Sequence, residues 1–309
     1  MVSEDCKLNL EQTLKDALLS DESVFLSMEP MSRHTTFRIG GPARYFISPA
    51  GEEDLAAVLR VCREKRIPWR ILGNGSNLLV SDSGCEGAVI STEGFCRGQV
   101  EGSEVRAGAG LLLSRAAHLA LEHSLTGMEF AAGIPGSAGG ALVMNAGAYG
   151  SEMKNILKEA RVMTPDGDVL VLQAEELELG YRTSCIPSKG YIVLEAVFGL
   201  ASGDHAAIEA QMKDLAARRK EKQPLEYPSA GSTFKRPAGY FAGRLIQDAG
   251  LRGYKVGGAQ VSEKHCGFVI NSGAATAADV MGLCGHVKET VKASFGVELE
   301  MEVKRWGEF

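Results

Sequence analysis

The sequence predicts an α+β protein with two or three domains. Its 309 residues exceed what one ordinary hydrophobic core holds. Apolar residues at helical spacing alternate along the chain with short β-rich runs. Two such runs, within 160–172, are joined by Asp166-Gly167, which is the turn signal of an antiparallel hairpin. Helices and antiparallel strands in one chain are typical of this class.

In the first half, apolar spacing predicts an amphipathic helix around Leu10, Leu14 and Leu18. A second helix stops before Pro68, because proline cannot continue it. The expected elements after the first helix are extended chain at 35–48 broken by Gly40-Gly41-Pro42, a helix at 52–65, strands at 69–72, 88–92 and 104–107, and a helix at 112–123.

In the second half, a polar helix runs up to Pro224, and we place a domain boundary there. Residues 298–305 alternate, so that Glu300 and Glu302 share one face while Leu299 and Val303 share the other. The expected elements are the hairpin at 160–172, a strand at 191–198, a helix at 204–222, a loop at 227–237, a helix at 241–249, a strand at 267–271, a helix at 277–294 and a strand at 298–305.

The composition excludes several function classes. Formal net charge is −6 without a polybasic block, so a nucleic-acid surface is not expected. Seven scattered cysteines without a Cys-x-x-Cys pair fit neither a disulfide scaffold nor a zinc ribbon, so we expect reduced thiols and no metal. The polar N-terminus is no signal peptide, and no apolar run reaches the ~18 residues that span a bilayer. We expect a soluble, cytoplasmic protein.

The most informative segment is 127–150, which has seven glycines in 24 residues and a single charge, Glu129. Apolar residues between the glycines indicate a packed segment rather than a linker. Packed glycines imply that another group approaches the main chain closely. Backbone N–H groups that no side chain shields can also bind anions. A phosphate-bearing cofactor and a tight turn in a closely packed sheet are equally good interpretations.

Three further motifs carry candidate chemistry. The loop 73–77 follows a strand, but it lacks the third glycine of a dinucleotide fingerprint and the lysine of a P-loop, so a plain turn is favoured when it is taken alone. Arg182 beside Tyr181 suits a carboxylate through its planar fork, or is a surface arginine. Ser232 lies in a glycine loop, where its hydroxyl is a proton donor or a helix cap. No catalytic triad or metal motif can be assembled.

Seven motifs in order give a more specific indication. The set TTFRIGGPA, ILGNGSNLLVSD, AGIPGSAGGALVMNAGAYG, GYRTS, AGSTFKRP, GGAQVSEKHCGFVIN and LEMEVKRWG closely resembles the MurB family of UDP-N-acetylenolpyruvoylglucosamine reductases. The resemblance runs from about residue 30 to the end. Only 49 residues separate Arg182 from Ser232, which leaves little room for the inserted loop of one family type. The chain is similar to the shorter, second type.

The resemblance implies a VAO/PCMH-type FAD-binding fold of two subdomains with a separate α+β substrate-binding domain. The corresponding ranges are 1–80, 81–203 and 204–309, with the last strand returning to the active site. FAD would be bound without a covalent link. The implied cofactor-binding residues are Arg38, Gly73, Asn74, Gly75, Ser76, Asn77, Gly133, Ile134, Pro135, Gly136, Ser137, Gly139, Gly140, Asn145 and Gly147. The last two would act through the backbone of 145–147.

The resemblance also implies the reaction. NADPH reduces FAD, and flavin N5 delivers hydride to the enolpyruvyl group of UDP-N-acetylglucosamine enolpyruvate, giving UDP-N-acetylmuramate for peptidoglycan. Arg182 would bind the substrate carboxylate, Glu302 would help stabilise the enol form, and Ser232 would donate the proton. The implied substrate-binding residues are Tyr181, Lys222, Lys235, Arg236, Arg252 and His265. His265 and Arg236 depart from the glutamine and asparagine of some relatives.

Two other functions remain open at this stage. One is a flavin oxidase of the same fold with another substrate, and the other is a nucleotide-sugar-binding protein without catalysis. The sequence contains no histidine placed in a glycine loop for covalent flavin attachment. We expect a monomer or weak oligomer whose partners are small molecules, with neither nucleic acid nor a membrane among them.

Overall fold

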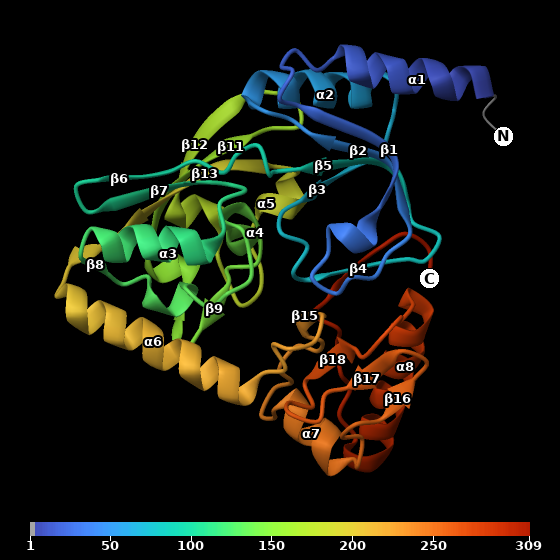
Figure 1. Cartoon of the computed structure of the whole chain (residues 1–309), viewed down its shortest axis with the longest axis vertical. Coiled ribbons are helices and arrows are strands. Elements are labelled where there is room, and N and C mark those ends of the chain that lie inside the picture. Colours follow the sequence, from blue (N-terminus) through green and yellow to red (C-terminus); the bar gives the residue numbers. More distant parts are fainter. Residues whose placement is uncertain (1–3) are drawn as a thin grey trace. The chain divides into compact units, whose positions relative to one another are not determined.

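The computed structural model describes residues 4–309, with side chains from residue 9 onward (Figure 1). The side chain of Cys6 lies outside the described residues. The chain divides into two compact units. Unit 1 comprises Met1–Ser27, Tyr45–Asn74 and Gly87–Arg218, and unit 2 comprises Met28–Arg44, Gly75–Glu86 and Arg219–Phe309. The three-domain division given above stays a prediction.

Unit 1 is built around a five-stranded antiparallel sheet of order β12-β11-β13-β7-β6. The expected hairpin is confirmed, because β11 and β12 pair with Ala160 opposite Leu172. Helix α3 packs against β6 and β7 (Figure 1). The elements are β6 (Gly98–Glu101), β7 (Glu104–Gly108), α3 (Leu113–Glu122), β8 (Leu125–Thr126), α4 (Ala138–Val143), β9 (Gly147–Ala148), β10 (Ser151–Glu152), β11 (Leu157–Met163), β12 (Val169–Gln173), α5 (Ile186–Lys189), β13 (Ile192–Gly199), β14 (Ala201–Ser202) and α6 (His205–Lys222).

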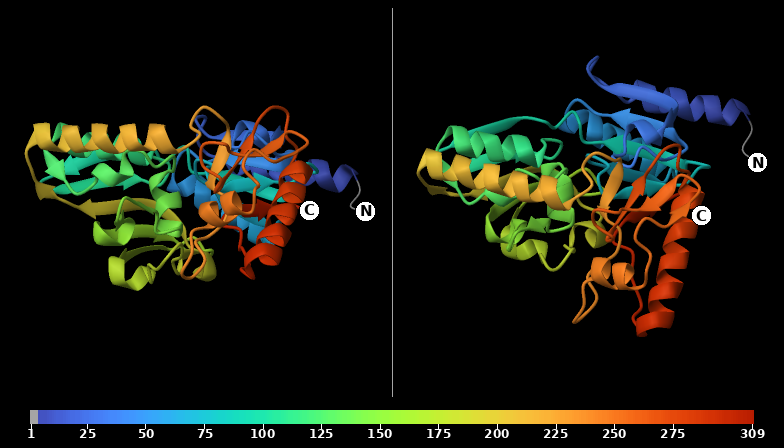
Figure 2. Two further views of the ribbon diagram at one scale, coloured as in Figure 1. Left: turned by 90° about the horizontal axis from the view of Figure 1, so that it is seen from below. Right: turned by 60° about the horizontal axis from the view of Figure 1, so that its bottom comes forward.

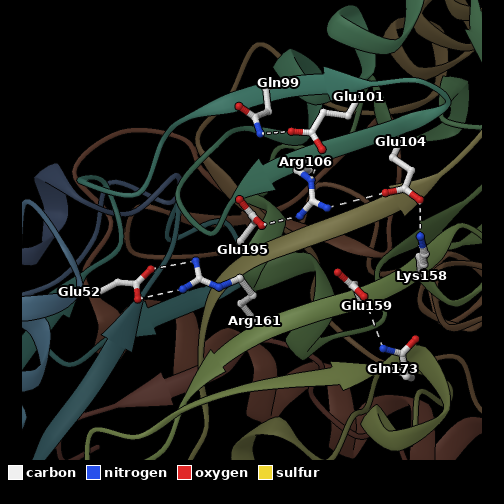
Figure 3. A network of polar contacts seen from close by, with 10 residues as sticks. All are labelled: Glu52, Gln99, Glu101, Glu104, Arg106, Lys158, Glu159, Arg161, Gln173 and Glu195. Carbon is white, nitrogen blue, oxygen red and sulfur yellow. Dashed lines mark hydrogen bonds and ion pairs between the residues drawn. The ribbon is translucent and has the colours of Figure 1, made fainter.

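Charged side chains cover one part of this sheet (Figure 3). Arg106 on β7 contacts Glu101 on β6 at 3.0 Å and Glu195 on β13 at 3.3 Å. Arg161 on β11 faces Glu52, at the start of the second helix, at 2.9 Å. The contacts of Arg106 join neighbouring strands across the sheet, as opposite charges on paired strands do, whereas the contact of Arg161 joins the sheet to that helix.

A second sheet has the strand order β1-β2-β5-β3, with β3 parallel to β5. The expected helix beside it is confirmed as α2 (Glu52–Glu64), and its apolar face, with Leu55, Leu59 and Cys62, is buried. The N-terminal helix α1 packs next to α2 (Figure 1). The remaining elements here are α1 (Glu4–Asp16), β1 (Val24–Pro30), β2 (Pro42–Ser48), β3 (Trp69–Leu72) and β5 (Cys85–Ser91).

Unit 2 contains a four-stranded sheet of order β15-β18-β17-β16 and two helices. Figure 2 shows α8 alongside these strands. Its core includes Leu245, Val269, Leu283 and Val287. The elements are β4 (Leu78–Val80), β15 (Ser229–Ser232), α7 (Ala242–Asp248), β16 (Lys255–Val256), β17 (Ala259–Val261), β18 (Phe268–Asn271), α8 (Ala277–Phe295) and β19 (Lys304–Trp306).

The start of α8 is fixed from two sides. Thr276 and Asp279 form a capping box, in which each side chain accepts a hydrogen bond from the other residue's backbone N–H at 3.0 Å. The Asp82 carboxylate also accepts hydrogen bonds from the N–H groups of Ala277 and Ala278, at 2.8 and 2.9 Å. An anion at a helix start satisfies donors that have no partner within the helix. Asp82 therefore ties α8 to a distant part of the sequence.

The expected strand at 298–305 is wrong in its extent. Only Lys304–Trp306 forms β19, which pairs in parallel with β4, and Met301 makes a single bridge to Phe234. The alternation is real, because Leu299 and Val303 are buried while Glu300 is exposed. Alternation of apolar and polar residues indicates which side chains are buried. A β-strand also needs a neighbouring strand with which it pairs along its whole length. Among the described residues no helix is both long and apolar enough to cross a membrane.

Candidate functional site

Two glycines of the segment 127–150 serve packing within unit 1. A Cβ on Gly139 would lie 2.9 Å from the Cβ of Ala109, and one on Gly147 would lie 2.6 Å from the carbonyl oxygen of Ser151. Contacts below 3.0 Å force a neighbour to move, so these positions exclude larger residues. The interpretation as a closely packed segment therefore accounts for both.

Other residues of the segment meet the first part of the loop 73–77. Asn74 Nδ2 donates to the carbonyl of Pro135 at 2.7 Å. A Cβ on Gly73 would lie 2.5 Å from Ser137 Oγ and 3.9 Å from the Cα of Gly140. Two segments far apart in sequence thus form one cradle of bare backbone.

The cradle retains hydrogen-bond donors. The N–H groups of Ala138 and Gly139 donate to Leu111 and Ala109, and that of Ile134 donates to Ala131. The N–H groups of Gly136 and Ser137 have no partner among residues 4–309. Unpaired N–H groups beside glycines fit an anionic group such as a phosphate. The residues present are therefore compatible with a phosphate-bearing cofactor.

Arg182 lies in a tight turn of unit 1. Gly180 and Thr183 exchange backbone hydrogen bonds of 3.1 and 3.3 Å, so Tyr181 and Arg182 are the central residues. Arg182 has φ of 54°, and one of its Nη atoms donates to the carbonyl of Gly147 at 3.4 Å. Its guanidinium lies 5.4 Å from the ring centre of Tyr181, which is exposed. The turn presents the cation together with the aromatic ring.

Asn145 was expected to contact the cofactor through the 145–147 backbone, and its side chain makes hydrogen bonds within unit 1. It is fully buried, at 0% exposure. Its Nδ2 donates to the carbonyl of Gly180 at 3.0 Å, and its Oδ1 accepts from the N–H of Lys154 at 2.9 Å. Any contact that Asn145 makes with a cofactor would therefore use its backbone.

In unit 2, backbone pairing brings Ser232 and Glu302 together. Thr233 follows Ser232, and its carbonyl accepts from the N–H of Glu302 at 2.9 Å. The N–H of Thr233 donates to Gly267 at 2.9 Å, and its buried Oγ1 accepts from Val269 at 2.9 Å. Sequence reasoning missed Thr233, although a threonine between glycine and phenylalanine in AGSTF was a signal. Two of the three expected catalytic residues thus lie on adjacent backbone segments.

The second half of the loop 73–77 belongs to unit 2. Gly75 has φ of +59°, and a Cβ there would lie 2.0 Å from the carbonyl oxygen of His34. The carbonyl of Asn77 accepts from the N–H of Lys304 at 3.0 Å. Arg38 is exposed at φ of 55° in a turn whose Phe37 carbonyl accepts from Asn271 at 3.3 Å. These contacts direct the Arg38 side chain outward.

The expected substrate-binding cations differ in the contacts that they already make with other groups of the protein. Lys235 pairs with Glu300, and Arg236 lies 4.0 Å from the ring centre of Phe241. Arg252 donates to the side chain of Gln247 at 2.6 Å and also to the carbonyl of Glu263. Lys222 is exposed at the end of α6.

His265 differs from the other four because it is uncharged near neutral pH. Burial lowers its pKa below the ordinary value. Its Nδ1 accepts from the N–H of Gly267 at 3.1 Å, which leaves Nε2 to carry the proton. A Cβ on Gly267 would lie 2.9 Å from the ring and one on Gly243 would lie 3.2 Å from it. The ring is held in place and offers a neutral donor.

The expected residues thus form two groups. Unit 1 contains Gly73, Asn74, Gly133, Ile134, Pro135, Gly136, Ser137, Gly139, Gly140, Asn145, Gly147, Tyr181 and Arg182. Unit 2 contains Arg38, Gly75, Ser76, Asn77, Lys222, Ser232, Lys235, Arg236, Arg252, His265 and Glu302. Within the part of the chain that the structure describes, no cluster of three or more metal-ligating side chains occurs.

Comparison with known proteins agrees with the observed arrangement. Residues 43–173 match a family model described as an FAD binding domain, and residues 223–306 match one described as the C-terminal domain of UDP-N-acetylenolpyruvoylglucosamine reductase. The expected FAD-binding fold with a separate C-terminal domain is confirmed.

Individual relatives bear the same name. The UDP-N-acetylenolpyruvoylglucosamine reductase of Lachnoclostridium phytofermentans is 56% identical over 96% of this chain and 97% of its own length. That of Clostridium perfringens is 54% identical over 89% of this chain and 90% of its own length. The crystal structure of MurB from Thermus caldophilus has a TM-score of 0.80 and 36% identity, covering 93% of this chain and 99% of that one. The chain therefore belongs to the MurB family of UDP-N-acetylenolpyruvoylglucosamine reductases.

Proposed function

We propose that this protein reduces UDP-N-acetylglucosamine enolpyruvate to UDP-N-acetylmuramate, using NADPH and FAD, in peptidoglycan precursor synthesis. Identity to reductases of that name over nearly the whole chain supports the substrate. Within the structure, the observation that carries the proposal is the backbone pairing of Thr233 with Glu302, which places the segments that carry Ser232 and Glu302 next to each other. A proton donor beside an acidic group is what protonation of a carbanion requires.

FAD would be held in part by the cradle of unit 1. Gly73 and Asn74 from the loop and residues 133–137 supply bare backbone, and the N–H groups of Gly136 and Ser137 suit its phosphates. FAD bound there would supply the hydride transfer from NADPH to the vinyl carbon of the substrate.

Side chains of the protein would stabilise the negative charge that develops on the substrate and would supply the proton. The planar guanidinium of Arg182 binds both oxygens of the enolpyruvyl carboxylate, next to the carbon where negative charge develops. Glu302 helps to stabilise the enol form. Ser232 Oγ gives its proton to the carbon that bears the carboxylate. A serine hydroxyl is a poor acid, so its neighbours must assist this transfer.

The substrate's diphosphate would meet a mixed set of donors in unit 2. Lys222 offers an exposed cation, whereas His265 offers a neutral N–H. Lys235 is engaged with Glu300, so binding of a phosphate there would compete with an ion pair. We therefore assign the main positive charge of this subsite to Lys222 and Arg252.

We also propose that the protein works in the cytoplasm as a monomer or weak oligomer. The cysteines whose side chains are described are free thiols, which supports a reducing compartment. Sedimentation of the purified protein would test the oligomeric state, since a stable, concentration-independent dimer contradicts it.

The substitution Ser232→Ala tests the catalytic proposal by separating the two halves of the reaction. Addition of NADPH should bleach the flavin absorbance near 450 nm at the wild-type rate, because Ser232 has no role in that step. Addition of the enolpyruvyl substrate should then fail to restore the absorbance. Full turnover by the variant would refute the role of Ser232, and a protein that takes up no FAD would refute the function.

A further inference from the structure

The buried amide of Asn145 makes both of its hydrogen bonds to backbone. Its Nδ2 reaches Gly180, the first residue of the turn that carries Arg182, at 3.0 Å. Its Oδ1 reaches Lys154, just after β10, at 2.9 Å. With 0% exposure it has no access to solvent. A buried amide with both ends satisfied fixes the position of the two segments that it joins.

The turn that Asn145 holds is in an unfavourable conformation. Arg182 has φ of 54°, where side chains other than glycine and asparagine are disfavoured. In a four-residue turn with positive φ at the third position, glycine or asparagine is usual. An arginine there persists only when surrounding contacts hold it. The conformation therefore depends on its anchors.

Two other anchors fix the same turn to the same segment. Ser184 Oγ donates to the carbonyl of Val143 at 2.9 Å, and Ser184 is only 9% exposed. Arg182 itself donates to the carbonyl of Gly147 at 3.4 Å. Val143, Asn145 and Gly147 lie at alternate positions of one segment, so hydrogen bonds with this one segment hold the turn in place.

We propose that Asn145 is a positioning residue for Arg182, acting through the carbonyl of Gly180 rather than as a side-chain ligand of the cofactor. The inference rests on the proposed function, in which Arg182 binds the substrate carboxylate. Without the amide, the turn relaxes toward negative φ at Arg182, and the guanidinium no longer faces the carboxylate in a fixed orientation. Recognition of the carboxylate then weakens, while contacts to the uridine diphosphate do not change.

The test uses Asn145→Gly, because Asn145 also has a positive φ, of 41°, and glycine accepts it without strain. Binding is measured by calorimetry on oxidised, FAD-loaded protein without NADPH, so that no turnover occurs. The two ligands are UDP-N-acetylglucosamine enolpyruvate and UDP-N-acetylglucosamine, which lacks the carboxylate. A second variant, Ser184→Ala, removes a neighbouring anchor and keeps the test informative if the glycine variant folds poorly.

Glu129→Ala is the matched control. Glu129 is 6% exposed in the same unit, and its carboxylate accepts two hydrogen bonds, from Thr126 Oγ1 at 2.6 Å and the N–H of Gly127 at 2.9 Å. Neither of these hydrogen bonds goes to the turn 180–183. Its removal therefore reproduces the loss of a buried side chain with two hydrogen bonds and leaves the anchors of Arg182 in place.

We expect Asn145→Gly to weaken binding of the enolpyruvyl substrate by about 10-fold, the equivalent of one hydrogen bond to a charged group. Binding of UDP-N-acetylglucosamine and the FAD content should stay at wild-type values. In FAD-free protein, hydrogen exchange of the 180–185 amides should accelerate. Ser184→Ala should show a smaller loss of substrate affinity and a smaller acceleration of exchange. Glu129→Ala should change neither the substrate affinity nor the exchange at 180–185.

Three results would overturn the proposal: an equal loss for both ligands, a loss of FAD with unchanged exchange at 180–185, or the same pattern in Glu129→Ala. Failure of the underlying function has a different signature. If Arg182→Ala binds the two ligands as the wild type does, Arg182 does not bind the carboxylate. The exchange measurement uses neither ligand nor FAD, and it would still report whether Asn145 holds the turn.

Discussion

Replacement of Gly73 by alanine should weaken both the fold and FAD binding. The added Cβ would lie 2.5 Å from Ser137 Oγ, whereas ordinary contact begins at 3.4 Å. The hydroxyl has to rotate, which removes its cap on Gly140 at a cost of about 0.5–1 kcal/mol. The extra methyl adds about 1–2 kcal/mol of strain, of which the lower entropy of the unfolded chain offsets about 0.4–1 kcal/mol. The free energy of unfolding should fall by about 1–2 kcal/mol.

The methyl group also fills the cradle that we assign to FAD, so we expect FAD affinity to fall at least about 10-fold. Urea unfolding of the FAD-free protein measures the first effect, and quenching of flavin fluorescence on titration measures the second. Gly285→Ala is the control, because its backbone in α8 is helical and, among residues 4–309, no atom apart from its chain neighbours and the nearby helix backbone lies within 4 Å of its Cβ position. That variant should be more stable by about 0.5–1 kcal/mol.

Ser137→Ala completes the experiment as a double-mutant cycle. Without the hydroxyl, the nearest atom to the new Cβ is the Cβ of residue 137, at an ordinary 3.7 Å. Gly73→Ala should then cost about 1 kcal/mol less than it does beside the serine. The reasoning fails if the cost is the same in both backgrounds, or if Gly73→Ala retains full flavin affinity.

Three further outcomes follow from other contacts. Asp82→Ala should lower the free energy of unfolding by about 1–2 kcal/mol in urea, because two N–H groups at the start of α8 lose their acceptor; an unchanged midpoint would exclude this role. The N–H of the helix-capping residue holds the pKa of Asp279 below its ordinary 3.8, so its stabilisation is present above that pH and is lost as pH falls through the lower folded value. Melting curves of Asp279→Asn should lack that part of the acid loss. Burial raises the pKa of Cys62 and Cys284 to about 12, so peptide mapping after thiol labelling at pH 8 should show label on exposed Cys96 and none on these two.

Local patterns predicted the elements whose causes are local. The helix at 52–65 and the long helix from residue 277 have apolar spacing that any packing partner would require. The hairpin at 160–172 is specified by its own turn residues. In these cases a short stretch of sequence contains the reason for its structure.

The rest depends on residues far away in the chain. β19 is only three residues long because its partner is the short strand Leu78–Val80. No sequence feature near residue 304 indicates that partner. The side-chain amide of Asn145 binds the carbonyl of Gly180, and nothing near residue 145 in the sequence indicates that partner. The positive φ of Arg182 runs against the backbone preference of arginine, so the residue type alone predicts a negative φ there. A neutral His265 likewise follows from burial among distant segments.

The pairing of β19 with β4 has a consequence for the order of synthesis. Unit 2 is assembled from three separate stretches, and its strand Leu78–Val80 can pair only after Lys304–Trp306, far later in the chain, has been translated. A nascent chain therefore carries a β4 without this partner until residues 304–306 have been translated. A fragment beginning at residue 219 would lack β4 and the Asp82 cap on α8, so it would not reproduce this unit. Unit 2 is C-terminal for most of its length, but it includes residues from the first third of the chain.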